Sequence, residues 1–120
     1  MTQVHSIPEL LADNRPSLSI EIYPPKTDQG LSNLKSRLDA FKSFDPQFIS
    51  ITYGAGGSTR VNTQYLTEYV QNQLNITALS HLTCVDQTRD ELKEHILKLK
   101  QAGICNIMAL RGDPPGGGLR

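Results

Sequence analysis

Short apolar segments recur along the chain at an interval of 29 residues. They begin near residues 18, 47, 76 and 105, each is rich in Ile or Leu, and none contains proline. Segments of this length and composition are typical of buried β-strands. We therefore predict strands over 18–23, 47–52, 76–82 and 105–110.

Stretches with the spacing of amphipathic helices separate these strands. Apolar side chains recur every three or four residues over 28–41, 61–74 and 88–102, which predicts three helices. The last of them has the clearest ends. Thr88 begins a Thr-x-x-Glu capping box, which satisfies the first free N–H groups, and Gly103 suits the left-handed residue that closes a helix.

The predicted order is βαβαβαβ, and such strand–helix–strand units join parallel strands by right-handed crossovers. They build either a doubly wound open sheet or a (β/α)8 TIM barrel. A complete barrel needs about 250 residues, and this chain has 120. We predict an α/β fold that is the first half of a (β/α)8 TIM barrel, with four strands and three main helices. A compact open α/β domain is the alternative.

The chain divides into two parts in this interpretation. We expect residues 1–16 to be an N-terminal extension and residues 17–120 to hold the β/α repeats. The last residues, PPGGGLR, are typical of a turn and are followed by no further strand or helix. We therefore expect the polypeptide to be a fragment of a longer barrel.

Alternation within the strands predicts which side chains share a face. Ile20 and Ile22 alternate with polar side chains in the first strand. We expect the aliphatic face to lie under the helices and the mixed face to point toward a barrel axis. This places Glu21, Thr52 and His81 on the inner face near the carboxyl ends of three strands. Ligands bind at that end in both architectures.

Glu21 is the most informative of these residues. A carboxylate in an apolar strand is costly to bury unless it is paired or protonated. One interpretation is a structural ion pair with a cation such as Lys26 or Arg111. The other is a glutamic acid that keeps its proton and is poised to donate it.

Polar groups also stand at the other strand ends, and each has a structural alternative. The loop 53–60 enters a helix and could cradle an anion or a cofactor edge, or could be only a tight turn. His81 alone is more readily a hydrogen-bonded structural histidine. Arg111 and Asp113 could form a weak loop salt bridge. Four polar strand ends together favour a functional site over any of these explanations.

Composition narrows the possible functions. Twelve Lys and Arg balance twelve Asp and Glu, so no overall field draws the chain to nucleic acid or to a membrane surface. No apolar run approaches the roughly 20 residues that span a bilayer, and no secretory signal begins the chain, so we expect a cytoplasmic protein. Cys84 and Cys105 lack the spacing of metal ligands, so we expect no metal.

Four motifs at the predicted strand ends resemble one known family. They read SIEIYPPK at 19–26, SITYGA at 50–55, HLTC at 81–84 and ALRGDPP at 109–115. In this order and at this spacing they resemble the methylenetetrahydrofolate reductases. The resemblance covers the chain from about Ser17 to Pro115.

The resemblance implies a flavoprotein oxidoreductase built on a (β/α)8 barrel. FAD in this family takes hydride from NADPH or NADH and reduces 5,10-methylenetetrahydrofolate to 5-methyltetrahydrofolate. The reaction belongs to tetrahydrofolate interconversion in one-carbon metabolism and supplies methionine biosynthesis. A homo-oligomeric full-length protein is expected, and the sequence leaves open whether the donor is NADPH or NADH.

The resemblance also implies roles for single residues. Glu21 would be the general acid that assists opening of the folate imidazolidine ring, and Asp113 would be a second catalytic residue near the flavin and the pterin. Thr52 would lie near the nicotinamide. The cofactor-binding residues that the resemblance implies are Thr52, Tyr53, Ala55, His81, Arg111, Gly112 and Asp113.

The length of the chain limits what it can do alone. The second half of the barrel would supply the remaining contacts to FAD, nicotinamide and folate, so we expect this polypeptide to be inactive by itself. The alternative function is a non-catalytic half-barrel that binds a ligand or a partner chain through its open edge. A Schiff-base aldolase is disfavoured, because no lysine stands at a predicted strand end.

Overall fold

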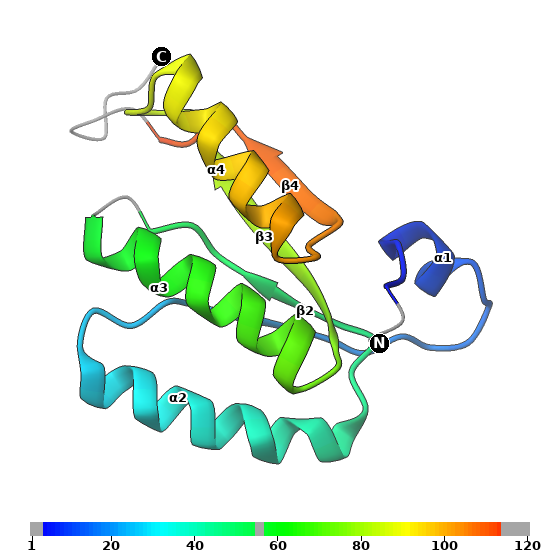
Figure 1. Ribbon diagram of the computed structural model, residues 1–120. Helices are drawn as coiled ribbons and strands as arrows, with labels where there is room; N and C mark the ends of the chain where they lie inside the picture. The colour runs from blue at the N-terminus through cyan, green and yellow to red at the C-terminus, as the bar shows by residue number, and fades with distance from the viewer. Residues whose placement is uncertain (1–3, 55–56, 114–120) are drawn as a thin grey trace.

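A computed structural model of the chain describes residues 4–54 and 57–113 (Figure 1). Strands and helices alternate after a short first helix. The elements in chain order are α1 (Ile7–Leu11), β1 (Ser19–Ile22), α2 (Asp28–Phe41), the 3-10 turn η1 (Lys42–Phe44), β2 (Phe48–Ile51), α3 (Gly57–Glu68), the π-helical turn η2 (Tyr69–Gln73), β3 (Thr77–Thr83), α4 (Arg89–Gln101) and β4 (Asn106–Leu110).

The four strands form one parallel sheet in the order β1-β2-β3-β4. Because the order never reverses and parallel crossovers are right-handed, the crossover helices α2, α3 and α4 all lie on the same face (Figure 1). A doubly wound sheet would instead carry helices on both faces. The predicted α/β repeat is confirmed, and its arrangement is consistent with half of a TIM barrel.

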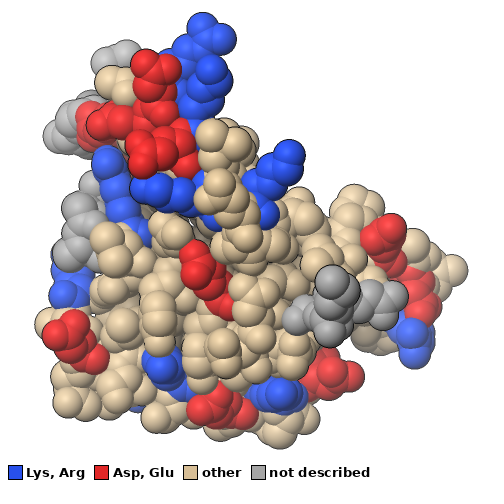
Figure 2. Space-filling model, viewed as in Figure 1, with Lys and Arg blue, Asp and Glu red and all other residues tan. Residues whose placement is uncertain are grey.

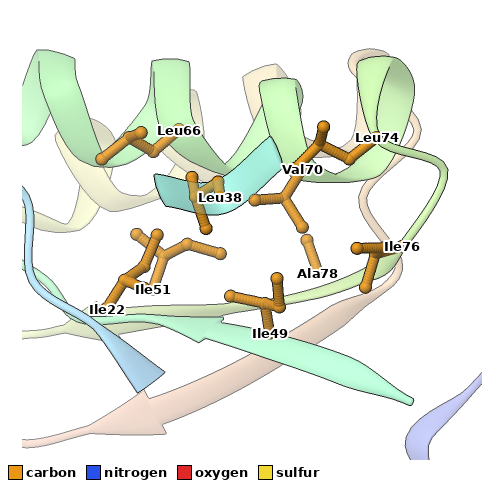
Figure 3. Close-up of a cluster of buried hydrophobic side chains, with 9 residues drawn as sticks. All are labelled: Ile22, Leu38, Ile49, Ile51, Leu66, Val70, Leu74, Ile76 and Ala78. Atoms are coloured by element: carbon orange, nitrogen blue, oxygen red, sulfur yellow. The ribbon is translucent and has the colours of Figure 1, made fainter. Parts of the chain in front are cut away.

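The core lies between the sheet and helices α2 and α3 (Figure 3). Ile22, Ile49 and Ile51 point from β1 and β2 toward Leu38 of α2 and Leu66 of α3. These side chains are at most 5% exposed. The aliphatic face of the strands therefore lies under the helices, as their alternation predicts.

Local sequence signals set the helix bounds where they are strong. α2 covers the predicted residues, Asp28–Phe41. At the start of α4, Thr88 Oγ1 accepts a hydrogen bond from the Glu91 N–H at 3.2 Å, and Glu91 Oε2 accepts one from the Thr88 N–H at 2.7 Å. Gly103 closes this helix with φ of +81°. The predicted capping box and C-terminal glycine are thus confirmed.

The helix after β2 differs from the prediction at both ends. It begins at Gly57, four residues before the predicted start, and it ends in the π-helical turn η2. The wider turn buries Gln71, whose side-chain oxygen accepts a hydrogen bond from the Ala78 N–H of β3 at 3.0 Å. A side-chain hydrogen bond to the next strand therefore accompanies this helix end, and apolar spacing alone does not reveal it.

α1 lies within the predicted N-terminal extension and was not itself predicted. Asn106 holds it beside the amino end of β4, since its side chain donates to the His5 carbonyl at 2.8 Å and accepts from the Ile7 N–H at 3.0 Å. The Gln47 side chain donates to the Leu10 carbonyl at 3.2 Å. These bonds place α1 at the end of the sheet opposite to the strand carboxyl ends.

The packing of α3 on the sheet predicts a stability difference between two leucine truncations. Leu66 is 0% exposed and Leu97 of α4 is 54% exposed. We expect Leu66→Ala to lower the free energy of unfolding by about 2–5 kcal/mol, because it leaves a cavity in the core. Leu97→Ala is the control and should change it by less than about 0.5 kcal/mol. Urea unfolding measures both, and equal losses would contradict this assignment of the core.

Candidate active site

The parallel register places three of the predicted site residues on one face of the sheet. Glu21 lies beside Ser50, and Ser50 lies beside Leu79. Residues aligned in this way project to the same face, as do residues two positions further on. Glu21, Thr52 and His81 therefore share the face turned away from the helices, near the carboxyl ends of their strands.

Each carboxyl oxygen of Glu21 has a polar neighbour, and one of the two contacts is a hydrogen bond. Its Oε1 lies 3.7 Å from His81 Nε2, and the Tyr23 hydroxyl donates to its Oε2 at 3.4 Å. Within the described part of the chain, Glu21 forms no salt bridge with Lys26 or Arg111, the cations that sequence reasoning considered. Its ionisable neighbour is instead a histidine, His81.

His81 is the buried member of this pair. It is 8% exposed, whereas the Glu21 side chain is 48% exposed. His81 Nε2 makes no hydrogen bond to any described residue. A buried imidazole nitrogen without a partner is costly, so this atom is suited to bonding with a polar group of a ligand.

Thr52 and Tyr53 point to opposite faces, as alternation requires. Thr52 follows β2 on the inner side, and its N–H donates to the Ile22 carbonyl at 3.0 Å. The Tyr53 ring lies 5.6 Å from the His95 ring of α4. Burial raises the pKa of the Tyr53 phenol and lowers the pKa of the His95 imidazole. The Tyr53 side chain thus lies away from Glu21 and His81, and Ala55 lies outside the described residues.

The β4 end carries the remaining candidates. The ladder between β3 and β4 continues past the strands, where the Val85 N–H donates to the Arg111 carbonyl at 3.0 Å. The Arg111 and Asp113 side chains are exposed. Among described residues they form no salt bridge with each other, and Arg111 Nε donates to the Gly112 carbonyl at 3.3 Å. The loop salt bridge considered from the sequence is therefore not formed.

Gly112 is required by both its conformation and its surroundings. Its φ is +84°, and a Cβ atom there would lie 2.5 Å from Val85 Cγ1 and 3.1 Å from Thr83 Cβ. The backbone at Gly112 thus packs directly on the side chains of Val85 and Thr83. This contact sets the position from which Arg111 and Asp113 extend.

Tyr23 is a site residue to which the sequence analysis gave no role. The available signal was its spacing, because residues two apart in a strand project to the same side. Its hydroxyl bond to Glu21 depends on side-chain rotamers, which strand alternation does not determine.

The charge and composition of the surface point to few further candidate functional residues. Figure 2 shows Lys and Arg interspersed with Asp and Glu over α4 and along α2, while the surface over α3 is mainly uncharged. Among residues 4–54 and 57–113 no three His, Cys, Asp or Glu side chains converge as metal ligands. No helix in the same residues is long and apolar enough to cross a membrane.

A parallel sheet with helices on one face and polar groups at the strand carboxyl ends is the arrangement of (β/α)-barrel enzymes. Comparison with known proteins narrows this class of enzymes to one family. The family model described as Methylenetetrahydrofolate reductase matches residues 6–119. The chain therefore belongs to the methylenetetrahydrofolate reductase family, a family of enzymes.

Relatives from plants and bacteria support this assignment. The "Probable methylenetetrahydrofolate reductase (NADH)" of Oryza sativa subsp. japonica is 40% identical over 117 residues, which are 98% of this chain and 20% of that protein. The "5,10-methylenetetrahydrofolate reductase" of Salmonella typhimurium is 39% identical over 103 residues, which are 85% of this chain and 35% of that protein. The chain thus spans between a fifth and about a third of the length of these relatives.

The two left-handed glycines allow a matched test of the close contact at Gly112. Gly103 has nearly the same φ, +81°, but a Cβ there would meet nothing within 4 Å. We expect Gly103→Ala to cost about 1 kcal/mol in unfolding free energy from backbone strain. Gly112→Ala should cost about 1–3 kcal/mol more, because Val85 must also move. Urea unfolding compares them, and equal costs would show that the contact relaxes freely.

Proposed function

We propose that this chain is the N-terminal part of an FAD-dependent methylenetetrahydrofolate reductase. The whole enzyme reduces 5,10-methylenetetrahydrofolate to 5-methyltetrahydrofolate with NADPH or NADH as donor. The carrying observation is the Glu21–His81 pair on the inner face of the sheet, in a chain of this family. The printed name of the rice relative includes NADH, while the residues of this chain leave the donor open.

The inner face fits a flavin in one specific respect. His81 Nε2 is buried, has no partner among the described residues, and lies on the face where a ligand would sit. We propose that FAD contacts Thr52, His81, Arg111, Gly112 and Asp113. Two further proposed contacts, Tyr53 and Ala55, belong to the loop after β2. FAD, when bound, carries hydride from the nicotinamide to the folate.

Glu21 is the proposed proton donor. Opening of the folate imidazolidine ring needs a proton on the departing nitrogen, and a positioned carboxyl group can supply it. The Tyr23 hydroxyl occupies Oε2, so the carboxyl proton is best placed on Oε1, which faces His81 and the inner side of the sheet. Asp113 is proposed as a second catalytic carboxylate, beside the flavin and the pterin.

The isolated chain is proposed to be inactive because its site is incomplete. β3 is buried along nearly its whole length, whereas Ile107, Met108 and Leu110 of β4 are 37–41% exposed. An uncovered strand of this kind needs further β/α units beside it. The same exposed strand favours the second candidate function, a non-catalytic half-barrel that binds a partner chain along β4.

Flavin retention separates these two functions. We expect the purified chain, mixed with FAD and desalted, to be colourless, because half of the site is missing. Mixed with the part of the Salmonella typhimurium relative that follows the matched segment, it should retain a visible flavin band. A coloured isolated chain would contradict the incomplete site. A colourless mixture, in which the two pieces nevertheless associate, would contradict the proposed flavin site.

Glu21→Gln tests the proton donor in the reconstituted mixture. The amide cannot donate an acidic proton, so kcat for folate reduction should fall by about 10²-fold or more, while flavin retention and flavin reduction by NADPH or NADH persist. Glu94→Gln is the matched control, since Glu94 pairs with Lys98 on the surface of α4 at 2.8 Å, and should leave kcat unchanged. Full folate reduction by Glu21→Gln would remove Glu21 from its proposed role.

A further inference from the structure

Two adjacent polar side chains of α3 reach the loops at the carboxyl ends of β1 and β2. Asn62 Nδ2 donates to the Pro25 carbonyl, in the loop after β1, at 2.7 Å. Thr63 Oγ1 donates to the Thr52 carbonyl at 3.2 Å. The same hydroxyl accepts from the Gly54 N–H at 3.4 Å. One hydroxyl group thus bonds to two residues of the loop after β2, Thr52 and Gly54.

The hydroxyl of Thr63, a buried helical threonine, bonds to residues outside its own helix. A helical threonine hydroxyl commonly bonds back to a carbonyl one turn earlier in its own helix. The Thr67 hydroxyl does this, since its Oγ1 donates to the Thr63 carbonyl at 2.7 Å. Thr63 and Thr67 are both 0% exposed, and the Thr63 hydroxyl reaches across to the loop after β2. A valine would fill the same volume and lose both loop bonds.

The loop fixed in this way carries a residue of the candidate site. Thr52 lies on the inner face with Glu21 and His81, and its own N–H bonds to the Ile22 carbonyl at 3.0 Å. The strand ends of β1 and β2 and the middle of α3 are therefore joined as one unit. Movement of the Thr52–Gly54 backbone would therefore displace Thr52 on the inner face of the sheet.

We propose that Thr63 is a positioning residue of the candidate active site, whose hydroxyl holds the loop Thr52–Gly54 in place for ligand contact. The role of Thr63 in ligand contact rests on the proposed function. The hydrogen bonds from Thr63 to the loop do not, because they exist in the chain without any ligand.

Exchange of the Gly54 amide hydrogen, followed by NMR in the full chain, tests the proposal. Thr63→Val removes the acceptor, so Gly54 exchange should accelerate by about fivefold, the order expected for one hydrogen bond. Thr63→Ser keeps the hydroxyl and should restore the original rate. Thr67→Val is the matched control: it removes one buried hydroxyl from the same helix and should leave Gly54 exchange unchanged.

Equal acceleration by Thr63→Val and Thr67→Val would overturn the proposal, because the effect would then be general loosening of α3. Failure of Thr63→Ser to restore the rate would overturn it too. If Thr63→Val does not fold, Thr63→Ser and Thr63→Ala form the comparison, since they differ only in the hydroxyl, and equal Gly54 exchange in that pair would overturn the proposal.

A second measurement separates this inference from the proposed function. In the reconstituted mixture, Thr63→Val should weaken FAD retention about fivefold, whereas Thr67→Val should not. If even the unmodified mixture binds no flavin, the proposed function fails, and the Gly54 comparison still decides whether Thr63 holds the loop. If flavin binds equally in both variants, Thr63 has no positioning role for that ligand.

Discussion

The in-register parallel pairing of the strands is the constraint on which the rest of the structure depends. It aligns Ile22 with Ile51 beneath the helices, and it aligns Glu21 with Ser50 and Leu79 on the opposite face. A shift of one residue in any strand would exchange its two faces. The core and the candidate site are therefore set by the same register, and burial of the isoleucines holds Glu21 on the inner side.

Register also explains how Glu21 and His81 approach each other across an intervening strand. The β2 residue beside Glu21 is Ser50, which is 9% exposed and has a small side chain. A bulky side chain there would stand between the carboxyl group and the imidazole. With serine at this position, Glu21 Oε1 reaches to within 3.7 Å of His81 Nε2. The proposed acid and its buried partner thus depend on a small residue between them as much as on their own positions.

Most of this architecture could be predicted from local signals, because strand alternation, helical spacing and the Thr88 capping box act over a few residues. Alternation placed Glu21, Thr52 and His81 on one face, and it also implies that the Tyr53 side chain turns toward α4. The flavin role of Tyr53 came from resemblance and stays a prediction. Other features depend on partners far along the chain. α1 is held by Asn106, and the hydroxyl of Thr63 bonds to residues 52 and 54 across the β2–α3 connection.

The two halves of the site differ in how they are held. At β1 and β2, side chains of α3 form hydrogen bonds with the loops that follow these strands. This part of the site is therefore held in place by residues of the described chain. At β3 and β4, the contact of Gly112 with Val85 and Thr83 sets the strand ends, but Arg111 and Asp113 are exposed, and they follow a strand of which Ile107, Met108 and Leu110 are 37–41% exposed. Side chains in that setting gain fixed positions only when a neighbouring β/α unit packs on β4. The proposed proton donor therefore sits in the rigid half, and the proposed flavin contacts at Arg111 and Asp113 depend on assembly of the rest of the barrel.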